Sequence, residues 1–379
     1  MKDTQKRKVM FLIYSLCDGG AERVLVETVN RLPKERYDVT LMSLFHDETR
    51  AGLLSPDVHY RPALRVKNQK LKKILSGILQ HVIPAKWLYH WFFRNDADVE
   101  VAFMEAFPTK VLAYSTNTRA KKYAWVHIDV QTYTRQDRLF RSLQHQKACY
   151  ERFDGIYCVS ENVREAFSEK FGLTDRVHVA YNILDEKEIR RRKDAPVSDI
   201  PPRKEGEMLM VSVGSLIPRK GFERLIRVCG LLHSRGYRFH LLILGKGELY
   251  EELAEQVIDE HLQGVVELLG FRDNPYPYMA AADLYVCPSY VEGFSTVVSE
   301  AVVLETPVVT TDCSGMREIL GDSDYGLITQ NTEEALCEGI RMMLENEKVF
   351  HYYQQRVRER APFFYMEKRL AEYERILDQ

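Results

Sequence analysis

Two glutamates eight residues apart, Glu292 and Glu300, lie in the stretch EGFSTVVSE at the start of a predicted helix. The apolar run at residues 284–287 just before it is typical of a buried strand, and ligands bind beyond the carboxyl ends of parallel strands. Free N–H groups at a helix start attract pyrophosphate. Eight helical residues span about 12 Å, comparable to the distance between the two sugars of a nucleotide diphosphate sugar. One carboxylate would bind the transferred sugar and the other the ribose, although chance spacing of two solvated glutamates gives the same pattern.

A glycine-containing turn with two adjacent cations, GSLIPRKG, follows the predicted strand at residues 208–214. Its candidate phosphate-binding residues are Gly214, Ser215, Arg219 and Lys220. A helix follows the turn, so cations and free N–H groups would meet a phosphate together. Taken alone, the turn is equally compatible with a tight bend that carries surface charges.

Two further predicted strands of the second half end in similar loops. Gly245 and Lys246 follow the strand at residues 239–245. Phe271 and Asn274, in the stretch LLGFRDN, follow the next strand and could hold a nucleotide base. Because the carboxyl ends of parallel strands meet at one edge of a sheet, we expect these loops to converge on one site.

The first half has two candidates of its own. Gly20, in the stretch GGAER, follows the first predicted strand and opens a helix, where a glycine lets a substrate approach the backbone closely. His127, in YAWVHID, lies at a strand's carboxyl end, although a lone histidine is more often structural. The glycines do not form the G-x-G-x-x-G pattern of dinucleotide-binding enzymes, which argues against an oxidoreductase.

The elements G-G-A-E-R, P-R-K-G and E-x7-E, in this order along the chain, resemble the retaining glycosyltransferases of family 4, which have the GT-B fold. The resemblance covers nearly the whole chain and implies roles at matching positions. Glu292 would contact the donor sugar, Glu300 the ribose, and Lys220 the diphosphate leaving group. His127 would lie beside the donor sugar, Gly20 near the donor phosphate and acceptor, and the backbone of Phe294, Ser295 and Thr296 at the sugar and diphosphate.

The resemblance also implies the chemistry. The sugar would keep its anomeric configuration, and the departing phosphate would help to deprotonate the acceptor. Cations and the helix start would neutralise the diphosphate, so no metal or other cofactor is expected. One departure concerns the arginine that the family often has where this chain has Ser215, a role that Arg219 would take over.

Apolar runs that alternate with amphipathic segments must position these residues. Strands are predicted at residues 9–14, 39–44, 99–103, 123–127, 156–159, 177–180, 208–214, 239–245, 265–268, 284–287, 307–310 and 327–328. Helices are predicted at residues 21–32, 134–152, 222–234, 249–260, 296–304 and 333–345. Such alternation is typical of βαβ units with parallel sheets.

Two series of such units predict an α/β fold of two Rossmann-like, doubly wound domains that face a central cleft. The acceptor-side domain would span residues 1–184 and the nucleotide-sugar-binding domain residues 208–361. Residues 185–207 are charged and contain three prolines, which is typical of a solvated linker. Residues 362–379 would form a helix that either packs back onto the first domain or simply ends the second.

Composition limits the compartment and the partners. The seven cysteines are scattered without a C-x-x-C pair, which indicates buried thiols in a reducing compartment. The apolar run from Val9 is too short for a signal or transmembrane segment, so we expect a cytoplasmic protein. Residues 1–180 contain 29 basic and 21 acidic side chains, whereas the remainder contains 24 and 34. The first half therefore favours an anionic surface or substrate.

A basic aromatic segment, residues 65–94, lies within a longer stretch that has no acidic residue. From His59 to Asn95 the basic residues are Arg61, Arg65, Lys67, Lys70, Lys72, Lys73, Lys86 and Arg94, interleaved with Trp87, Trp91 and other apolar side chains. This mixture is typical of peripheral contact with an anionic membrane. Ordinary helices with their aromatic side chains in the core are the alternative, and nucleic acid is not expected.

The sequence thus predicts a metal-independent hexosyl- or N-acetylhexosaminyltransferase at the inner face of the plasma membrane. The donor would be a nucleotide sugar, with UDP favoured by the resemblance alone, and the acceptor a glycan or lipid-linked glycan. Two alternatives remain open: a non-catalytic partner subunit that binds a sugar nucleotide, and an epimerase of the same fold.

Overall fold

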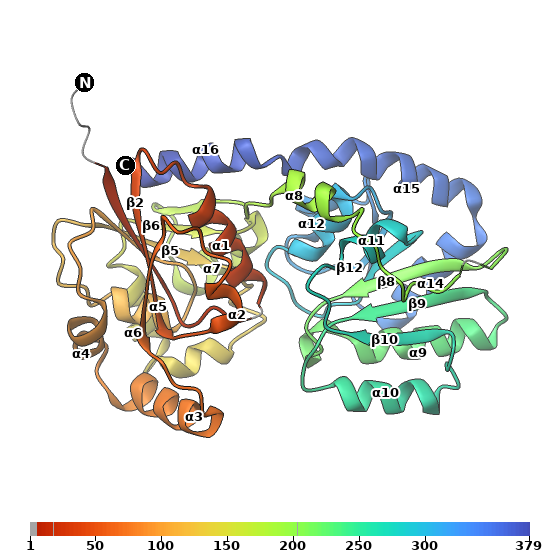
Figure 1. The fold of residues 1–379 in the computed structure, drawn as a ribbon, viewed down its shortest axis with the longest axis horizontal. Helices are drawn as coiled ribbons and strands as arrows, with labels where there is room; N and C mark the ends of the chain where they lie inside the picture. Colours follow the sequence, from red (N-terminus) through yellow and green to blue (C-terminus); the bar gives the residue numbers. More distant parts are fainter. Residues whose placement is uncertain (1–5, 18, 203) are drawn as a thin grey trace. The chain divides into compact units, whose positions relative to one another are not determined.

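The computed structural model describes residues 6–17, 19–202 and 204–379, which form two compact units. One unit combines the chain up to Ile183 with Glu367–Gln379, and the other spans Leu184–Met366. Each unit has one parallel sheet with helices packed against it (Figure 1). The predicted class, two doubly wound α/β domains, is confirmed.

The first sheet has seven strands in the order β3-β2-β1-β4-β5-β6-β7. The strands are β1 (Arg7–Ile13), β2 (Tyr37–Phe45), β3 (His59–Leu64), β4 (Val99–Ala102), β5 (Lys121–Val126), β6 (Gly155–Cys158) and β7 (Val177–Val179). The helices before β7 are α1 (Gly20–Arg31), α2 (Glu48–Ala51), α3 (Gln69–Gly77), η1 (Ile78–Val82), α4 (Ala85–Leu88), η2 (Tyr89–Phe93), α5 (Phe107–Leu112), η3 (Arg135–Leu139), α6 (Leu143–Tyr150) and α7 (Glu161–Phe171). The strand order reverses between β1 and β4, which pair with Val9 opposite Val99.

The second sheet has six strands in the order β10-β9-β8-β11-β12-β13. The strands are β8 (Met208–Val213), β9 (Phe239–Leu244), β10 (Val266–Gly270), β11 (Leu284–Cys287), β12 (Val308–Thr311) and β13 (Leu327–Thr329). The helices are α8 (Glu186–Arg192), η4 (Pro218–Lys220), α9 (Phe222–Ser234), α10 (Tyr250–Asp259), α11 (Tyr276–Ala281), α12 (Thr296–Val303), α13 (Met316–Leu320), α14 (Glu333–Glu345), α15 (Glu347–Arg360) and η5 (Ala361–Phe364). Here the order reverses between β8 and β11.

Buried apolar side chains hold the second unit together. Leu225 and Cys229 of α9 share a core cluster with Leu241 of β9 and with Leu336 and Ile340 of α14. Since the strands are apolar on both faces, helices must cover both faces of the sheet. This packing fixes the strand ends, from which the site loops leave.

Two expectations for the first unit were wrong in detail. The sequence analysis missed β3, because its sequence HYRPAL contains a proline and no run of buried apolar residues, and proline is tolerated in an edge strand. The single helix predicted over residues 134–152 is two shorter elements, η3 and α6. Ser142 interrupts them, since its side chain caps α6 by accepting the N–H of His145.

The last helix, α16 (Met366–Leu377), contacts the first sheet. The hydroxyl of Tyr37 donates to Asp378 at 2.7 Å, and Nε1 of Trp125 donates to the hydroxyl of Tyr373 at 3.2 Å. Arg36 adds ion pairs to Glu374 and Asp378. These contacts explain why residues 367–379 belong to the first unit.

The charged segment after residue 184, expected to be a solvated linker, includes α8 and belongs to the second unit. Ile189 of this helix is buried. Arg190 pairs with Glu305 at 3.3 Å, and Arg192 with Asp273 at 3.0 Å. The basic run is therefore paired on the second unit and is not simply solvated.

All seven cysteines are free thiols, and five of them are buried, whereas Cys17 is exposed and Cys313 is partly buried. Among the described residues, no helix is both long and apolar enough to cross a membrane.

Candidate functional site

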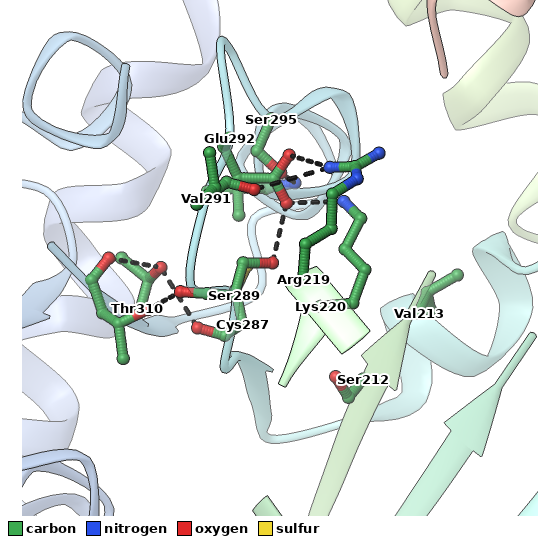
Figure 2. A network of polar contacts seen from close by, with 12 residues as sticks. Ser212, Val213, Arg219, Lys220, Cys287, Ser289, Val291, Glu292, Ser295 and Thr310 are labelled. Carbon is green, nitrogen blue, oxygen red and sulfur yellow. Dashed lines mark hydrogen bonds and ion pairs between the residues drawn. The ribbon is translucent and has the colours of Figure 1, made fainter. Parts of the chain in front are cut away.

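The predicted sugar and phosphate residues of the second unit come together at the reversal of its strand order. Arg219 and Lys220 lie on the short helix η4, which follows β8, and Glu292 lies on the loop that follows β11. Figure 2 shows the two basic side chains pointing toward the carboxylate of Glu292. A reversal point is where open parallel sheets bind ligands, because the loops on its two sides diverge.

The carboxylate of Glu292 is buried and accepts three polar contacts (Figure 2). The ammonium group of Lys220 lies 2.5 Å from Oε1, and the hydroxyl of Ser289 donates to the same oxygen at 2.7 Å. Nη1 of Arg219 lies 3.7 Å from Oε2. Ser289 is a contact that the sequence analysis missed, although its place two residues after β11 was a usable signal.

The electrostatics of this cluster favour an anionic ligand. Burial alone would raise the pKa of Glu292, but Lys220 and then Arg219 outweigh burial and hold that pKa below its ordinary value. The carboxylate is therefore ionised at neutral pH. Two cations share one carboxylate, which leaves an excess positive charge beside the start of α12.

The helix α12 begins where the sequence predicts. Ser295 is its N-cap and accepts the N–H of Val298 at 3.5 Å, while Phe294 is buried just before it. Thr296 is its first residue. Glu300 is completely buried on this helix, with the hydroxyl of Tyr276 at 3.5 Å from its Oε1. A buried carboxylate held on a helix is poorly explained by chance spacing of solvated glutamates.

The loops after β8 and β9 touch each other. A Cβ atom on Gly245 would lie 1.9 Å from the carbonyl oxygen of Gly214, so only glycine permits this approach. The N–H of Leu216 donates to the carbonyl of Lys246 at 2.9 Å. The predicted convergence of these two loops is therefore present, with Ser215 between the two contacts.

Phe271, after β10, is 45% exposed, and the ammonium of Lys246 lies 4.5 Å from its ring centroid. A ring presented in this way offers a stacking surface for a planar base. Asn274 instead donates to the carbonyl of Arg192 at 2.8 Å, so its amide is engaged with α8. This contact weakens the idea that Asn274 reads a base edge.

The first unit places His127 directly after β5, beside a carboxylate that the sequence analysis missed. Glu105, three residues after β4, accepts the backbone N–H of His127 and, at 3.0 Å, that of Ile128. Ala106 follows in a left-handed conformation with φ of 66°, a strained geometry for a residue with a side chain. Such strain concentrates at functional sites. An acidic residue close after a predicted strand was the available signal.

Burial dominates the protonation of this pair. It raises the pKa of Glu105 to about 7 and lowers the pKa of His127 to about 3. The imidazole is therefore neutral at physiological pH. Its Nε2 is shielded from solvent and has no hydrogen-bond partner within the described parts of the chain.

Gly20 is the first residue of α1, which begins one residue before the predicted start of this helix. Glu22, two residues later, is buried and accepts a hydrogen bond from the thiol of Cys17 at 3.2 Å. Burial, followed by the charge of Glu22, raises the pKa of Cys17 to about 12, so this thiol stays protonated.

No group of three or more His, Cys, Asp or Glu residues in the described ranges is arranged to hold a metal ion. Two acidic pairs have D-x-D spacing, Asp96 with Asp98 and Asp322 with Asp324, and one member of each forms an ion pair with a basic side chain. Asp96 pairs with Lys8 at 2.5 Å, and Asp322 with Arg317 at 2.8 Å.

Two family models match the chain. The model described as glycosyl transferases group 1 matches residues 196–361, and the model described as glycosyltransferase family 4 matches residues 18–188. Between them they match most of both units.

Curated relatives align along nearly the whole chain. An N-acetylgalactosamine-N,N'-diacetylbacillosaminyl-diphospho-undecaprenol 4-alpha-N-acetylgalactosaminyltransferase of Campylobacter jejuni is 27% identical over 94% of this chain and 96% of its own length. An amylovoran biosynthesis glycosyltransferase of Erwinia amylovora is 24% identical over 90% of this chain and 91% of its own.

Solved structures share the fold. The Anabaena protein HepE in complex with UDP-glucose matches with a TM-score of 0.76 and 20% identity, covering 98% of this chain and 99% of that one. Sucrose-phosphate synthase from Thermosynechococcus elongatus matches with a TM-score of 0.76 and 17% identity, covering 99% of both chains.

Proposed function

Because this chain belongs to the glycosyltransferases of group 1 and family 4, and has their GT-B fold, we propose that it is a retaining enzyme. It transfers a hexosyl or N-acetylhexosaminyl group from a UDP-sugar to a lipid-linked glycan at the cytoplasmic face of a membrane. No metal takes part. The observation that carries this proposal is the buried carboxylate of Glu292 with Lys220 and Arg219 at the start of α12.

In this mechanism the protein positions the donor and stabilises the charge that develops on it. Lys220, Arg219 and the start of α12 hold the diphosphate, and preformed donors of this kind lower the barrier most where charge accumulates. Glu292 binds hydroxyls of the transferred sugar and Glu300 binds those of the ribose. For His127, whose imidazole is neutral, we propose a role at the transferred sugar.

The lipid-linked acceptor is supported by one relative and by one surface. The Campylobacter jejuni relative is named for a diphospho-undecaprenol acceptor. In this chain the basic aromatic segment, residues 65–94, contains α3, η1, α4 and η2, and Figure 1 shows α3 and α4 at the periphery of the first unit.

Large apolar side chains of this segment face solvent. Exposed are Leu71, Ile74, Ile78, Val82, Trp87 and Trp91. No residue of α3 is buried, whereas Tyr89 and Phe93 of η2 lie in the core. The alternative, an ordinary segment with its aromatic side chains in the core, therefore fits η2 but not α3. Exposed tryptophan and aliphatic side chains beside lysines match an anionic lipid surface, where each lysine adds about 1 kcal/mol of attraction.

The donor is tested by thermal-shift measurements of the purified protein with UDP, GDP, ADP and NAD, and with Glu300→Gln as the matched variant. We expect UDP to raise the melting temperature of the wild type but not that of the variant. In a transfer reaction, the product should have the same anomeric configuration as the donor. A rise with GDP would change the nucleotide but keep sugar transfer. Binding without transfer to any acceptor would favour a non-catalytic subunit, and a changed sugar without acceptor would favour an epimerase.

Membrane contact is tested by co-sedimentation with phosphatidylcholine vesicles that contain or lack phosphatidylglycerol. The variant Ile74→Ser/Trp87→Ser/Trp91→Ser should bind the anionic vesicles at least about 10-fold more weakly, because three apolar side chains lose their insertion energy. Leu231→Ser/Ile258→Ser is the control, since both residues are large, apolar and exposed on the second unit. Equal loss in the control, or none in the variant, would reject this surface.

A further inference from the structure

The loop between β11 and α12 is held through its backbone carbonyl groups by side chains of the second unit. Four consecutive carbonyls, just before Glu292, accept such hydrogen bonds. The acceptors and their donors are Pro288 with Arg224 Nε at 2.7 Å, Ser289 with Arg224 Nη2 at 2.7 Å, Tyr290 with Asn331 Nδ2 at 2.9 Å, and Val291 with Arg219 Nη1 at 3.4 Å. An irregular loop with every carbonyl bonded in this way has little freedom to move.

Arg224, on α9, makes the two shortest of these contacts and is 1% exposed. Its remaining nitrogen, Nη1, donates to Oδ1 of Asn331 at 2.9 Å. Its guanidinium carbon lies 3.9 Å from the ring centroid of Tyr290. A buried cation is costly unless its donors are satisfied. Here two of the three nitrogens bind this loop, and the third binds Asn331, which itself donates to the loop.

The turn that carries Lys220 is packed against the same loop. Gly221 has φ of 67°, and a Cβ atom there would lie 2.1 Å from the carbonyl oxygen of Pro288 and 2.9 Å from Nε of Arg224. Only glycine allows this approach. The glycine of P-R-K-G therefore brings the turn with Lys220, the guanidinium of Arg224 and the loop with Glu292 into direct contact.

We infer that Arg224 is a positioning residue for sugar transfer, which acts by fixing residues 288–291 so that Glu292 is presented to the donor sugar. This inference rests on the proposed role of Glu292. Arg224 itself touches no substrate in this scheme. A purely structural arginine would stabilise the unit without any energetic coupling to Glu292.

The first test measures the loop in the ligand-free protein by hydrogen–deuterium exchange. Arg224→Lys keeps the charge but offers one nitrogen where arginine offers three. We expect the peptides that cover residues 288–296 to exchange about 10-fold faster. Arg227→Lys is the control, because Arg227 lies one turn further along α9 and pairs with Glu333 at 2.8 Å on the surface. Unchanged exchange in Arg224→Lys would overturn the inference.

If Arg224→Lys does not fold, Asn331→Ala replaces it. Asn331 is exposed, so its loss is tolerated more easily, yet it removes both a partner of Arg224 and the donor to the carbonyl of Tyr290. Faster exchange in the same peptides is expected, and wild-type exchange would again overturn the inference.

The second test is a double-mutant cycle of Arg224→Lys with Glu292→Gln, using UDP-N-acetylgalactosamine or whichever donor the screen identifies. Misplacement of a contact should lower kcat of Arg224→Lys by about 10- to 100-fold, with the donor KM changed only a few-fold. In the Glu292→Gln background the same substitution should cost little, because the residue it positions is already lost. Independent, multiplicative losses would overturn the inference. Wild-type turnover by Glu292→Gln would reject the role of Glu292 instead, while the exchange result on the loop would stand.

Discussion

Each sheet has a buried glutamate close to the point where its strand order reverses, but the two carboxylates have different hydrogen-bond and ion-pair partners. Glu292 lies within reach of two cations and a hydroxyl, all from side chains. Glu105 accepts two backbone N–H groups, and no lysine or arginine of the described residues forms an ion pair with it. The pKa of Glu292 is held below its ordinary value by Lys220, whereas burial raises the pKa of Glu105 to about 7.

The difference shows that burial alone does not decide the charge of a carboxylate. A cation at 2.5 Å offsets the loss of hydration at Glu292. Two N–H groups do not offset it at Glu105. The second unit is thus prepared for a ligand that brings more negative charge, and the first presents a nearly neutral surface around His127.

The largest effect should follow from removal of the cation. Lys220→Met leaves a buried carboxylate without its closest partner, which typically costs about 3–5 kcal/mol of unfolding free energy. The loss of charge stabilisation should also lower kcat/KM by about 10²- to 10³-fold. Chemical denaturation and steady-state kinetics measure the two effects.

The double variant Lys220→Met/Glu292→Gln separates them. It removes the unpaired charge, so most of the lost stability should return, but activity should not. Lys204→Met is the control, because Lys204 pairs with Glu207 on the surface, where such pairs contribute little. A double variant as unstable as Lys220→Met would show that the unpaired charge of Glu292 is not the cause of the instability. Lys220 would then not be what offsets the burial of this carboxylate.

The sequence predicted the second unit better than the first, for a physical reason. In the second unit the functional groups directly follow strongly apolar strands, and charges with short spacing such as Arg219 and Lys220 remain recognisable along the chain. The 12 predicted strands match observed ones, with boundaries that differ by at most two residues. The sequence singled out Glu292 and Glu300 because one lies just before a predicted helix start and the other lies on that helix.

Contacts between distant residues could not be predicted in this way. Glu105 accepts hydrogen bonds from the backbone of His127 and Ile128, which follow it by 22 and 23 positions. No spacing rule links residues so far apart in the sequence. Arg224 reads in the sequence as one more polar position of an amphipathic helix, yet it is buried against Pro288 and Ser289. The edge strand β3 was missed because its stability comes from pairing with β2 and not from its own composition.

A smaller effect, dependent on pH, should distinguish Glu105. Its folded pKa of about 7 exceeds the ordinary value of 4.5, so its favourable contribution is complete below pH 4.5 and is lost as the pH rises through 7. The charged and titratable groups that influence or adjoin it are Glu22, His127, Tyr150 and Cys158. Glu105→Gln cannot ionise, so its stability relative to wild type should increase between pH 5.5 and pH 8 by about 2 kcal/mol.

Urea denaturation at the two pH values measures this difference. Glu165→Gln, at an exposed position on α7, serves as the control and should follow the wild type at both values. A constant difference between Glu105→Gln and wild type would mean that Glu105 does not titrate in this range, and the contrast with Glu292 would disappear.

The smallest effect should follow from the loss of one hydroxyl. Ser289→Ala removes the donor at 2.7 Å from the charged Glu292 and should cost about 2 kcal/mol, as hydrogen bonds to charged groups do. Ser212→Ala is a matched control, since Ser212, on β8, is as buried as Ser289 and donates at 2.7 Å to the neutral carbonyl of Val286. The control should cost only about 1 kcal/mol and leave kcat unchanged. Because side chains supply the donors at Glu292 and the backbone supplies them at Glu105, only the first carboxylate can be released by such a substitution. Equal losses in the two serine variants would mean that the charge of Glu292 adds nothing to its hydrogen bond, and Lys220 and Arg219 would then account for its ionisation.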